Sequence, residues 1–136
     1  MVQVELSKII IDEKRQDQII VLKEKNGERQ FPIVIGFLEA SSIKMKLSNV
    51  ETPRPLTHDL VLLAIESLGA KVEQVVIDKL VNSTFHAKIV VKTSDHQLKN
   101  IDARPSDGVA IAVRAGVPIF VDEEILNKAS IFNPTE

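Results

Sequence analysis

The sequence predicts an α+β fold, with one compact domain of mainly antiparallel strands and three to four helices. Three observations lead to this prediction. Strand patterns gather into two groups, near residues 2–35 and 72–103. Helical patterns with recognisable end signals lie between and after these groups, which is typical of α+β proteins. The chain has 136 residues, of which 44% are hydrophobic, and this suits a single core.

The first group of strands begins at the amino terminus. Apolar and polar residues alternate over residues 2–6, and an apolar run follows at residues 9–11. Residues 19–22 form the next strand, and Asn26-Gly27 can adopt positive φ at both positions, so we expect a hairpin that returns over residues 29–35. A strand as apolar as residues 9–11 is prone to pair with other chains when it is free. We therefore expect it to lie centrally in the sheet or to be paired across a homodimer.

Two helical patterns follow Gly36, where the period of the apolar residues changes. The first helix has an apolar stripe made of Ala40, Ile43 and Leu47. Thr57 is predicted to be the N-cap of the second helix, which ends near Gly69. Residues 60–65 are all apolar. We therefore expect the second helix to be buried on nearly all sides.

The second half of the chain contains further strands and helices. The expected strands are residues 72–80, 85–93, 98–103 and 119–121. The expected helices are residues 107–115, capped by Ser106, and a last helix capped by Asp122, whose apolar stripe is Ile125, Leu126 and Ala129. Residues 1–130 then form the domain, and residues 131–136 form a flexible C-terminal tail.

Composition excludes several classes of protein. The absence of cysteine excludes disulfides, thiolate zinc sites and a cysteine nucleophile. A net charge of −2 and only 4% aromatic residues argue against a strongly basic surface or a base-stacking platform. No apolar run reaches the roughly 20 residues of a membrane helix, and the amino terminus lacks the pattern of a signal peptide. We therefore expect a cytoplasmic protein with no membrane partner.

Two similar blocks precede predicted helices, at residues 54–59 and 102–107. Each places Arg-Pro before a hydroxyl residue and an acid. Two interpretations are open. The hydroxyls and acids can cap the helices and form structural ion pairs. Alternatively, the carboxylates, arginines and histidine line a cleft for phosphodiester cleavage, in which carboxylates hold a metal ion and arginine stabilises charge on phosphorus.

Five ordered blocks of the sequence resemble the bifunctional nuclease domain family. They are Pro32–Ala40, Arg54–Leu60, Thr84–Ala87, Asp102–Asp107, and Arg114 with Pro118–Val121. The family name implies cleavage of both DNA and RNA, and the resemblance implies a compact α+β domain. His86 stands where the family usually has tyrosine, and Gly108 where alanine is usual. At Gly108 we expect that a ligand can approach the backbone.

The matched blocks supply the candidate site residues. The candidate catalytic residues are Glu39, His58, Asp59, Asp102 and Asp107. Three of these, Asp59, Asp102 and Asp107, are candidate ligands of Mg²⁺ or Mn²⁺, and Arg54, Arg104 and Ser106 are expected to bind phosphate. We expect the two predicted helix starts to lie close together. The alternative function is a non-enzymatic, self-associating interaction or regulatory domain, in which these residues form a buried lattice of ion pairs.

Overall fold

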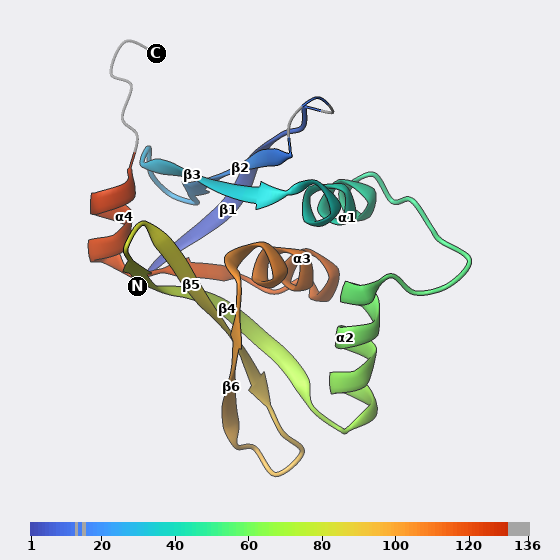
Figure 1. The fold of residues 1–136 in the computed structure, drawn as a ribbon. Coiled ribbons are helices and arrows are strands. Elements are labelled where there is room, and N and C mark those ends of the chain that lie inside the picture. Colours follow the sequence, from blue (N-terminus) through green and yellow to red (C-terminus); the bar gives the residue numbers. More distant parts are fainter. Residues whose placement is uncertain (13, 15, 131–136) are drawn as a thin grey trace.

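The structure, a computed structural model, describes residues 1–12, 14 and 16–130 (Figure 1). The predicted tail, residues 131–136, lies outside the described residues. The strands are β1 (Val2–Ile10), β2 (Asp17–Glu24), β3 (Gln30–Gly36), β4 (Lys71–Val81), β5 (Thr84–Lys92), β6 (Leu98–Ala103) and β7 (Ile119–Val121). The helices are α1 (Phe37–Leu47), α2 (Thr57–Ser67), α3 (Pro105–Ala115) and α4 (Glu123–Ala129). The predicted α+β fold is confirmed.

All of these strands belong to one sheet, in the order β3-β2-β1-β7-β4-β5-β6. Neighbouring strands are antiparallel, except that β4 and β7 are parallel. A single sheet therefore joins the two strand groups that the sequence separates. None of the helices in the described part of the chain is long and apolar enough to cross a membrane.

The amino-terminal strand β1 lies inside this sheet. Its residues 2–4 pair with β7 on one side, and residues 4–10 pair with β2 on the other. In the part of the chain that the structure describes, β1 therefore has neighbours on both sides only at residues 2–4, and the central position expected for residues 9–11 was wrong. Beyond that point β1 pairs with β2 alone among the described strands, and Ile10 is 50% exposed. Pairing of β1 across a homodimer stays a prediction.

The two predicted hairpins are confirmed, but one turn differs in detail. Asn82 and Ser83 join β4 to β5 with φ of 51° and 63°. Neither Asn26 nor Gly27 has a positive φ, so this part of the prediction was wrong. A five-residue connection, residues 25–29, reverses the chain between β2 and β3 instead. The longer connection spreads the reversal over more residues and removes the need for positive φ.

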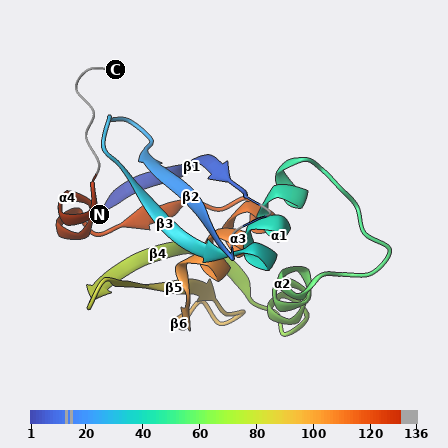
Figure 2. The ribbon, with the colours of Figure 1, turned by 45° about the horizontal axis from the view of Figure 1, so that its top comes forward.

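Helix α3 is the centre of the core. Figure 2 shows it between the two halves of the sheet, β1–β3 and β4–β6, and it contacts α1, α2, β3, β4 and β5. Residues 108–112 are all buried. Burial of apolar surface is worth about 25 cal/mol per Å², so packing against α3 from several sides accounts for much of the hydrophobic stabilisation.

Gly108 allows this close packing of helix against sheet. A Cβ atom at Gly108 would lie 2.8 Å from Cγ1 of Val75 and 3.8 Å from Cβ of Ala87. The expectation that a ligand approaches the backbone here was wrong, because β4 and β5 occupy that space. An alanine at position 108 would therefore have to displace the Val75 side chain, and overpacking of this kind lowers the free energy of unfolding by about 1–3 kcal/mol.

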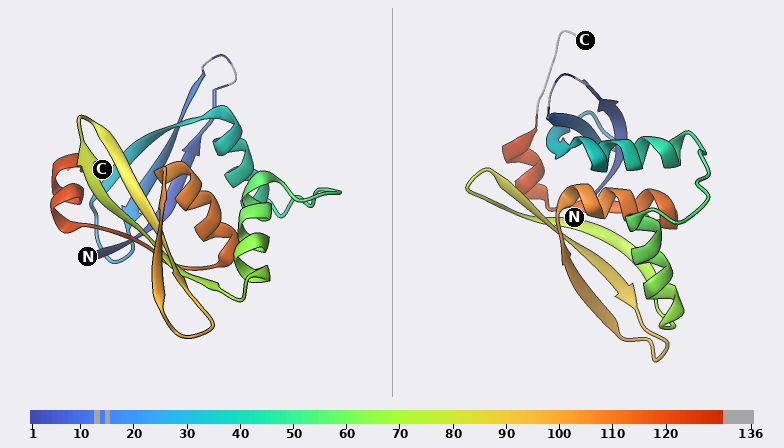
Figure 3. Two further views of the ribbon diagram at one scale, coloured as in Figure 1. Left: turned by 60° about the horizontal axis from the view of Figure 1, so that its bottom comes forward. Right: turned by 45° about the vertical axis from the view of Figure 1, so that its right-hand side comes forward.

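Helix α2 is far more exposed than predicted. None of its described residues is buried, and Leu60 and Leu63 are 60% and 46% exposed. The helix lies beside α3 and the start of β4 (Figure 3) and contributes the partly buried Leu62 and Ile65 to the core. The prediction was wrong because α1 and α3 already pack on the sheet, which leaves α2 only one side on which to pack.

Candidate functional site

The two Arg-Pro blocks begin the helices α2 and α3. Arg104 is the N-cap of α3, and Pro105 is its first helical residue. Proline suits this position because its fixed φ is helical and the missing N–H would have no partner there. Helix α2 begins differently, because Leu56 is its N-cap and both Arg54 and Pro55 precede the helix. Thr57 and Ser106 are therefore helical residues rather than the predicted N-caps.

The starts of α2 and α3 lie side by side, as predicted. Nε2 of His58 lies 2.8 Å from Oδ1 of Asp107. Arg104 donates from Nε to Oδ2 of Asp107 at 2.8 Å and from Nη2 to Oε1 of Glu39 at 3.0 Å. The side chain of Arg104 is 65% exposed. We call Glu39, His58, Arg104 and Asp107 the open half of the site.

A pocket of about 400 Å³ adjoins the open half, and all four of its residues line the wall. The remaining walls are Leu38, Ser41, Ser42 and Met45 of α1, with Leu56 and Thr57 at the start of α2. Apolar walls with a few converging polar groups are typical of small-molecule sites. The pocket therefore offers a substrate access to His58 and Asp107.

A second group of side chains, of which Ser42 also lines the pocket, holds the three helices together. The side chain of Arg114 on α3 is 4% exposed. Its Nε donates to Oδ1 of Asp59 on α2 at 2.8 Å, and its Nη2 donates to Oγ of Ser42 on α1 at 2.8 Å. Nη1 donates to the Ala110 carbonyl at 3.2 Å. We call Ser42, Asp59 and Arg114 the buried half.

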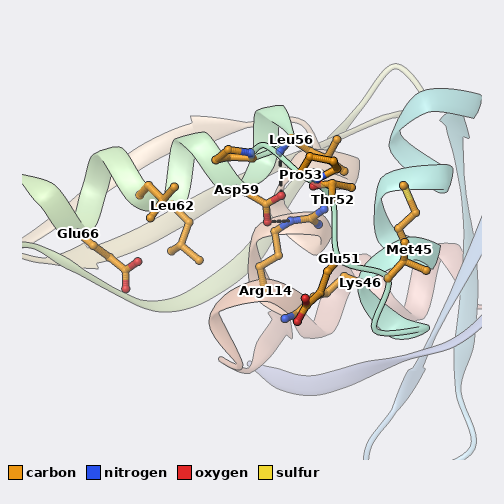
Figure 4. A pocket seen from close by; sticks show the side chains of 13 residues that line it. Met45, Lys46, Glu51, Thr52, Pro53, Leu56, Asp59, Leu62, Glu66 and Arg114 are labelled. Carbon is orange, nitrogen blue, oxygen red and sulfur yellow. Dashed lines mark hydrogen bonds and ion pairs between the residues drawn. The ribbon is translucent and has the colours of Figure 1, made fainter.

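Figure 4 shows Arg114 and Asp59 joined at the wall of a different pocket, of about 500 Å³. That pocket is formed mainly by the end of α1, the connection to α2 and one side of α2. Asp59 also accepts the backbone N–H of Leu56 at 3.0 Å and so stabilises the first turn of α2. These contacts give Asp59 a structural role.

Ser42 connects the two halves. Its Oγ lies 2.9 Å from Nδ1 of His58 and accepts the hydrogen bond from Arg114. The side chain of His58 is 12% exposed and is held at both ring nitrogens. A ring fixed in this way presents a defined orientation to a substrate.

Electrostatic interactions keep both aspartates ionised. Burial would raise the pKa of Asp107, but hydrogen bonds from Arg104 and His58 outweigh it, so the pKa lies below the usual 3.8. Burial likewise opposes ionisation of Asp59, while the Leu56 N–H and Arg114 hold its pKa below 3.8. Both groups are hydrogen-bond acceptors at neutral pH.

These lowered pKa values predict a loss of stability in acid. We expect the free energy of unfolding to be level above about pH 5 and to fall as the pH drops through about 4. The reason is that the unfolded chain, whose carboxyl pKa values are higher, takes up protons before the folded chain does. Urea unfolding between pH 6 and pH 3 measures this. The double variant Asp59→Asn/Asp107→Asn should show a shallower slope, and stability that rises on acidification would contradict the prediction.

The structure brings together only part of the predicted site. Asp102 is exposed on β6, opposite Lys88 of β5, and Arg54 is exposed in the connection between α1 and α2. Ser106 is 6% exposed and faces a different pocket, which is also lined by Arg104. In the described part of the chain, no group of three or more His, Asp or Glu side chains is placed to hold a metal ion. The three predicted ligands are therefore not brought together among the described residues, and a role for Mg²⁺ or Mn²⁺ stays a prediction.

Sequence reasoning did not select Ser42 or Arg114 as site residues. A usable signal exists for both, because residues on one face of a helix recur after three, four or seven positions. Ser42 follows Glu39 by three residues on α1, and Arg114 follows Asp107 by seven on α3. Each is therefore carried on the same face as a residue that the sequence did select.

Comparison with known proteins agrees with the family resemblance of the five sequence blocks. The family model described as the bifunctional nuclease domain matches residues 20–134. An uncharacterized protein of Mycobacterium tuberculosis is 41% identical over 136 residues, which is 100% of this chain and 80% of that protein.

Plant proteins are also similar. Bifunctional nuclease 2 of Oryza sativa subsp. japonica is 31% identical over 118 residues, covering 85% of this chain and 36% of the rice protein. Bifunctional nuclease 1 of Arabidopsis thaliana is 28% identical over 107 residues, covering 76% of this chain and 33% of that protein. The chain thus spans about a third of these plant relatives.

Proposed function

Since this chain belongs to the bifunctional nuclease domain family, we propose that it cleaves phosphodiester bonds in nucleic acid at the pocket beside the open half. The observation that carries the proposal is the contact between His58 and Asp107 in the wall of that pocket. Nuclease names among the plant relatives support the same reaction, although they belong to proteins about three times as long.

His58 is suited to general acid–base catalysis in this reaction. Its ring is held between Asp107 and Ser42, so its orientation is fixed before a substrate arrives. Asp107 accepts from one ring nitrogen and stabilises the positive charge that forms when the other takes a proton. A positioned acid or base of this kind contributes about 10²–10⁴-fold to the rate.

Arg104 is suited to hold the phosphate. It is the most exposed member of the open half, and its raised pKa, which follows mainly from its contacts with Asp107, keeps it charged. Among the described residues, its Nη1 has no hydrogen-bond partner, which leaves two N–H donors for phosphate oxygens. Binding through these donors does not require Arg104 to leave its carboxylate partners.

The test is a nuclease assay on highly purified protein, with single-stranded DNA and RNA as substrates. We expect the unaltered chain to cleave, and we expect His58→Gln to lose about 10²-fold or more of the rate while retaining its fold by circular dichroism. Parallel reactions with Mg²⁺, Mn²⁺ and EDTA measure any metal requirement separately. Equal activity in parent and variant would identify a contaminating nuclease.

An inactive parent protein would favour the alternative function, a non-enzymatic and self-associating domain. The exposed apolar residues of α2 favour association, because Leu60, Leu63 and Leu68 are 60%, 46% and 86% exposed. The two functions assign different roles to the open half. Catalysis requires its pocket to admit a substrate, whereas association requires only that the ion pairs hold α1, α2 and α3 in place.

A further inference from the structure

Ser42, His58 and Asp107 form one continuous chain of hydrogen bonds. Oγ of Ser42 lies 2.9 Å from Nδ1 of His58, and Nε2 of the same ring lies 2.8 Å from Oδ1 of Asp107. The three residues come from α1, α2 and α3, and all three line the pocket of about 400 Å³. Three helices therefore converge on a serine, a histidine and an aspartate in hydrogen-bonding order.

Asp107 sets the direction of the protons along this chain. An ionised carboxylate only accepts, so Nε2 of His58 carries the ring hydrogen and donates it to Asp107, which leaves Nδ1 as the acceptor in the neutral form of the ring. The hydroxyl of Ser42 then donates to Nδ1, while its oxygen accepts from Nη2 of Arg114. The same sequence of donors and acceptors activates serine in serine hydrolases.

We propose that Ser42 is the nucleophile of this site and that cleavage passes through a covalent phosphoseryl intermediate. The inference rests on the proposed phosphodiester cleavage. In the first step a bond forms between Oγ and phosphorus, the bond from phosphorus to the leaving oxygen breaks, and the serine proton passes through Nδ1 of His58 to that oxygen. In the second step His58 accepts a proton from water, whose oxygen attacks phosphorus and releases Oγ, and the proton returns to Ser42.

Arg114 supports the nucleophile as well as orienting it. Its Nη2 lies 2.8 Å from Oγ of Ser42, so the guanidinium stabilises negative charge on that oxygen as the proton leaves. The side chain is 4% exposed, and this contact is therefore little screened by water.

An uncharged phosphorus reagent tests the proposal directly. A small neutral probe needs none of the contacts that a nucleic-acid phosphate would make with Arg104, so it reports on the reactivity of Ser42 itself. Diisopropyl fluorophosphate is neutral, and its reaction needs no further reagent. Oγ of the serine bonds to phosphorus, the P–F bond breaks, fluoride leaves, and His58 takes the proton.

We expect the intact protein to gain one diisopropylphosphoryl group, located on Ser42 by peptide mass spectrometry. Ser42→Ala should gain none. His58→Gln and Asp107→Asn should be labelled at least about 10²-fold more slowly than the parent. Ser67→Ala is the matched control, because Ser67 is exposed at the end of α2 and lies outside the lining of this pocket, and it should label at the parental rate. The peptide map of the parent locates the adduct even if Ser42→Ala does not fold.

No adduct on the parent protein, or an adduct on Ser41, would overturn the assignment of Ser42. Failure of this inference is distinguishable from failure of the proposed function. A chain that cleaves nucleic acid without accepting the label keeps its nuclease function and loses the serine nucleophile. A chain that is labelled at Ser42 but leaves DNA and RNA intact keeps the nucleophile and loses the nuclease function.

Discussion

Arg114→Met is expected to lower the free energy of unfolding by about 2–3 kcal/mol, because it removes the hydrogen bonds of a buried guanidinium, while the Asp59 carboxylate left behind is 36% exposed and can be solvated. Methionine retains most of the apolar length of arginine, so the loss comes from the guanidinium rather than from a cavity. Three helices lose contacts together, because Arg114 on α3 bonds Asp59 on α2 and Ser42 on α1. Urea unfolding followed by circular dichroism measures the change.

Arg104→Met is the matched control for this prediction. The side chain of Arg104 is 65% exposed, compared with 4% for Arg114, although both make hydrogen-bonded contacts with carboxylates on neighbouring elements. Exposed ion pairs are typically worth about 1 kcal/mol or less. Equal destabilisation by the two substitutions would contradict the division of the site into a buried and an open half.

Local sequence patterns were sufficient to predict most of the fold. Alternation of apolar residues predicts β1, and the apolar run at residues 119–121 predicts β7, because these patterns depend on neighbours along the chain. The approach of the starts of α2 and α3 was also predictable. Polar groups next to apolar helices need solvent or partners of opposite charge, and two such groups satisfy one another.

The failed predictions concern which side of an element faces its neighbours. Residues 60–65 are apolar enough for a buried helix, yet α2 lies outside because α1 and α3 occupy the sheet. The sequence suggests that a ligand can approach the backbone at Gly108, but the side chain of Val75 occupies that space. These outcomes depend on packing between distant segments, which a local pattern does not contain.

The same limit explains why the structure separates two of the predicted metal ligands, Asp102 and Asp107. Asp102 and Asp107 are five residues apart, and their similar setting suggested a shared role. The first lies at the end of an exposed edge strand, while the second lies in the first turn of α3 and faces His58. Ser42 and Arg114 were missed for the converse reason, because the spacing that places them on the same faces as Glu39 and Asp107 does not show that they meet across two helices.

Asp107→Asn is expected to lower the rate of nucleic-acid cleavage by about 10²–10⁴-fold while leaving the fold intact. Asparagine has the shape of aspartate, but its amide nitrogen donates where Arg104 and His58 also donate, so the ring of His58 loses its fixed orientation. Asp107 is 29% exposed and Arg104 is 65% exposed, so the cost in stability should stay near 1 kcal/mol. Cleavage rates and urea unfolding of the same preparations separate the two effects.

Asp102→Asn provides the comparison that decides the role of the carboxylates. Asp102 is exposed on β6 and makes no contact with the open half in the described part of the chain, so we expect both cleavage and stability to match those of the parent. The two substitutions make the same chemical change five residues apart, which controls for the loss of one negative charge. A loss of cleavage in Asp102→Asn as large as in Asp107→Asn would instead support a metal ion shared by the two carboxylates, with Asp102 brought inward when substrate binds.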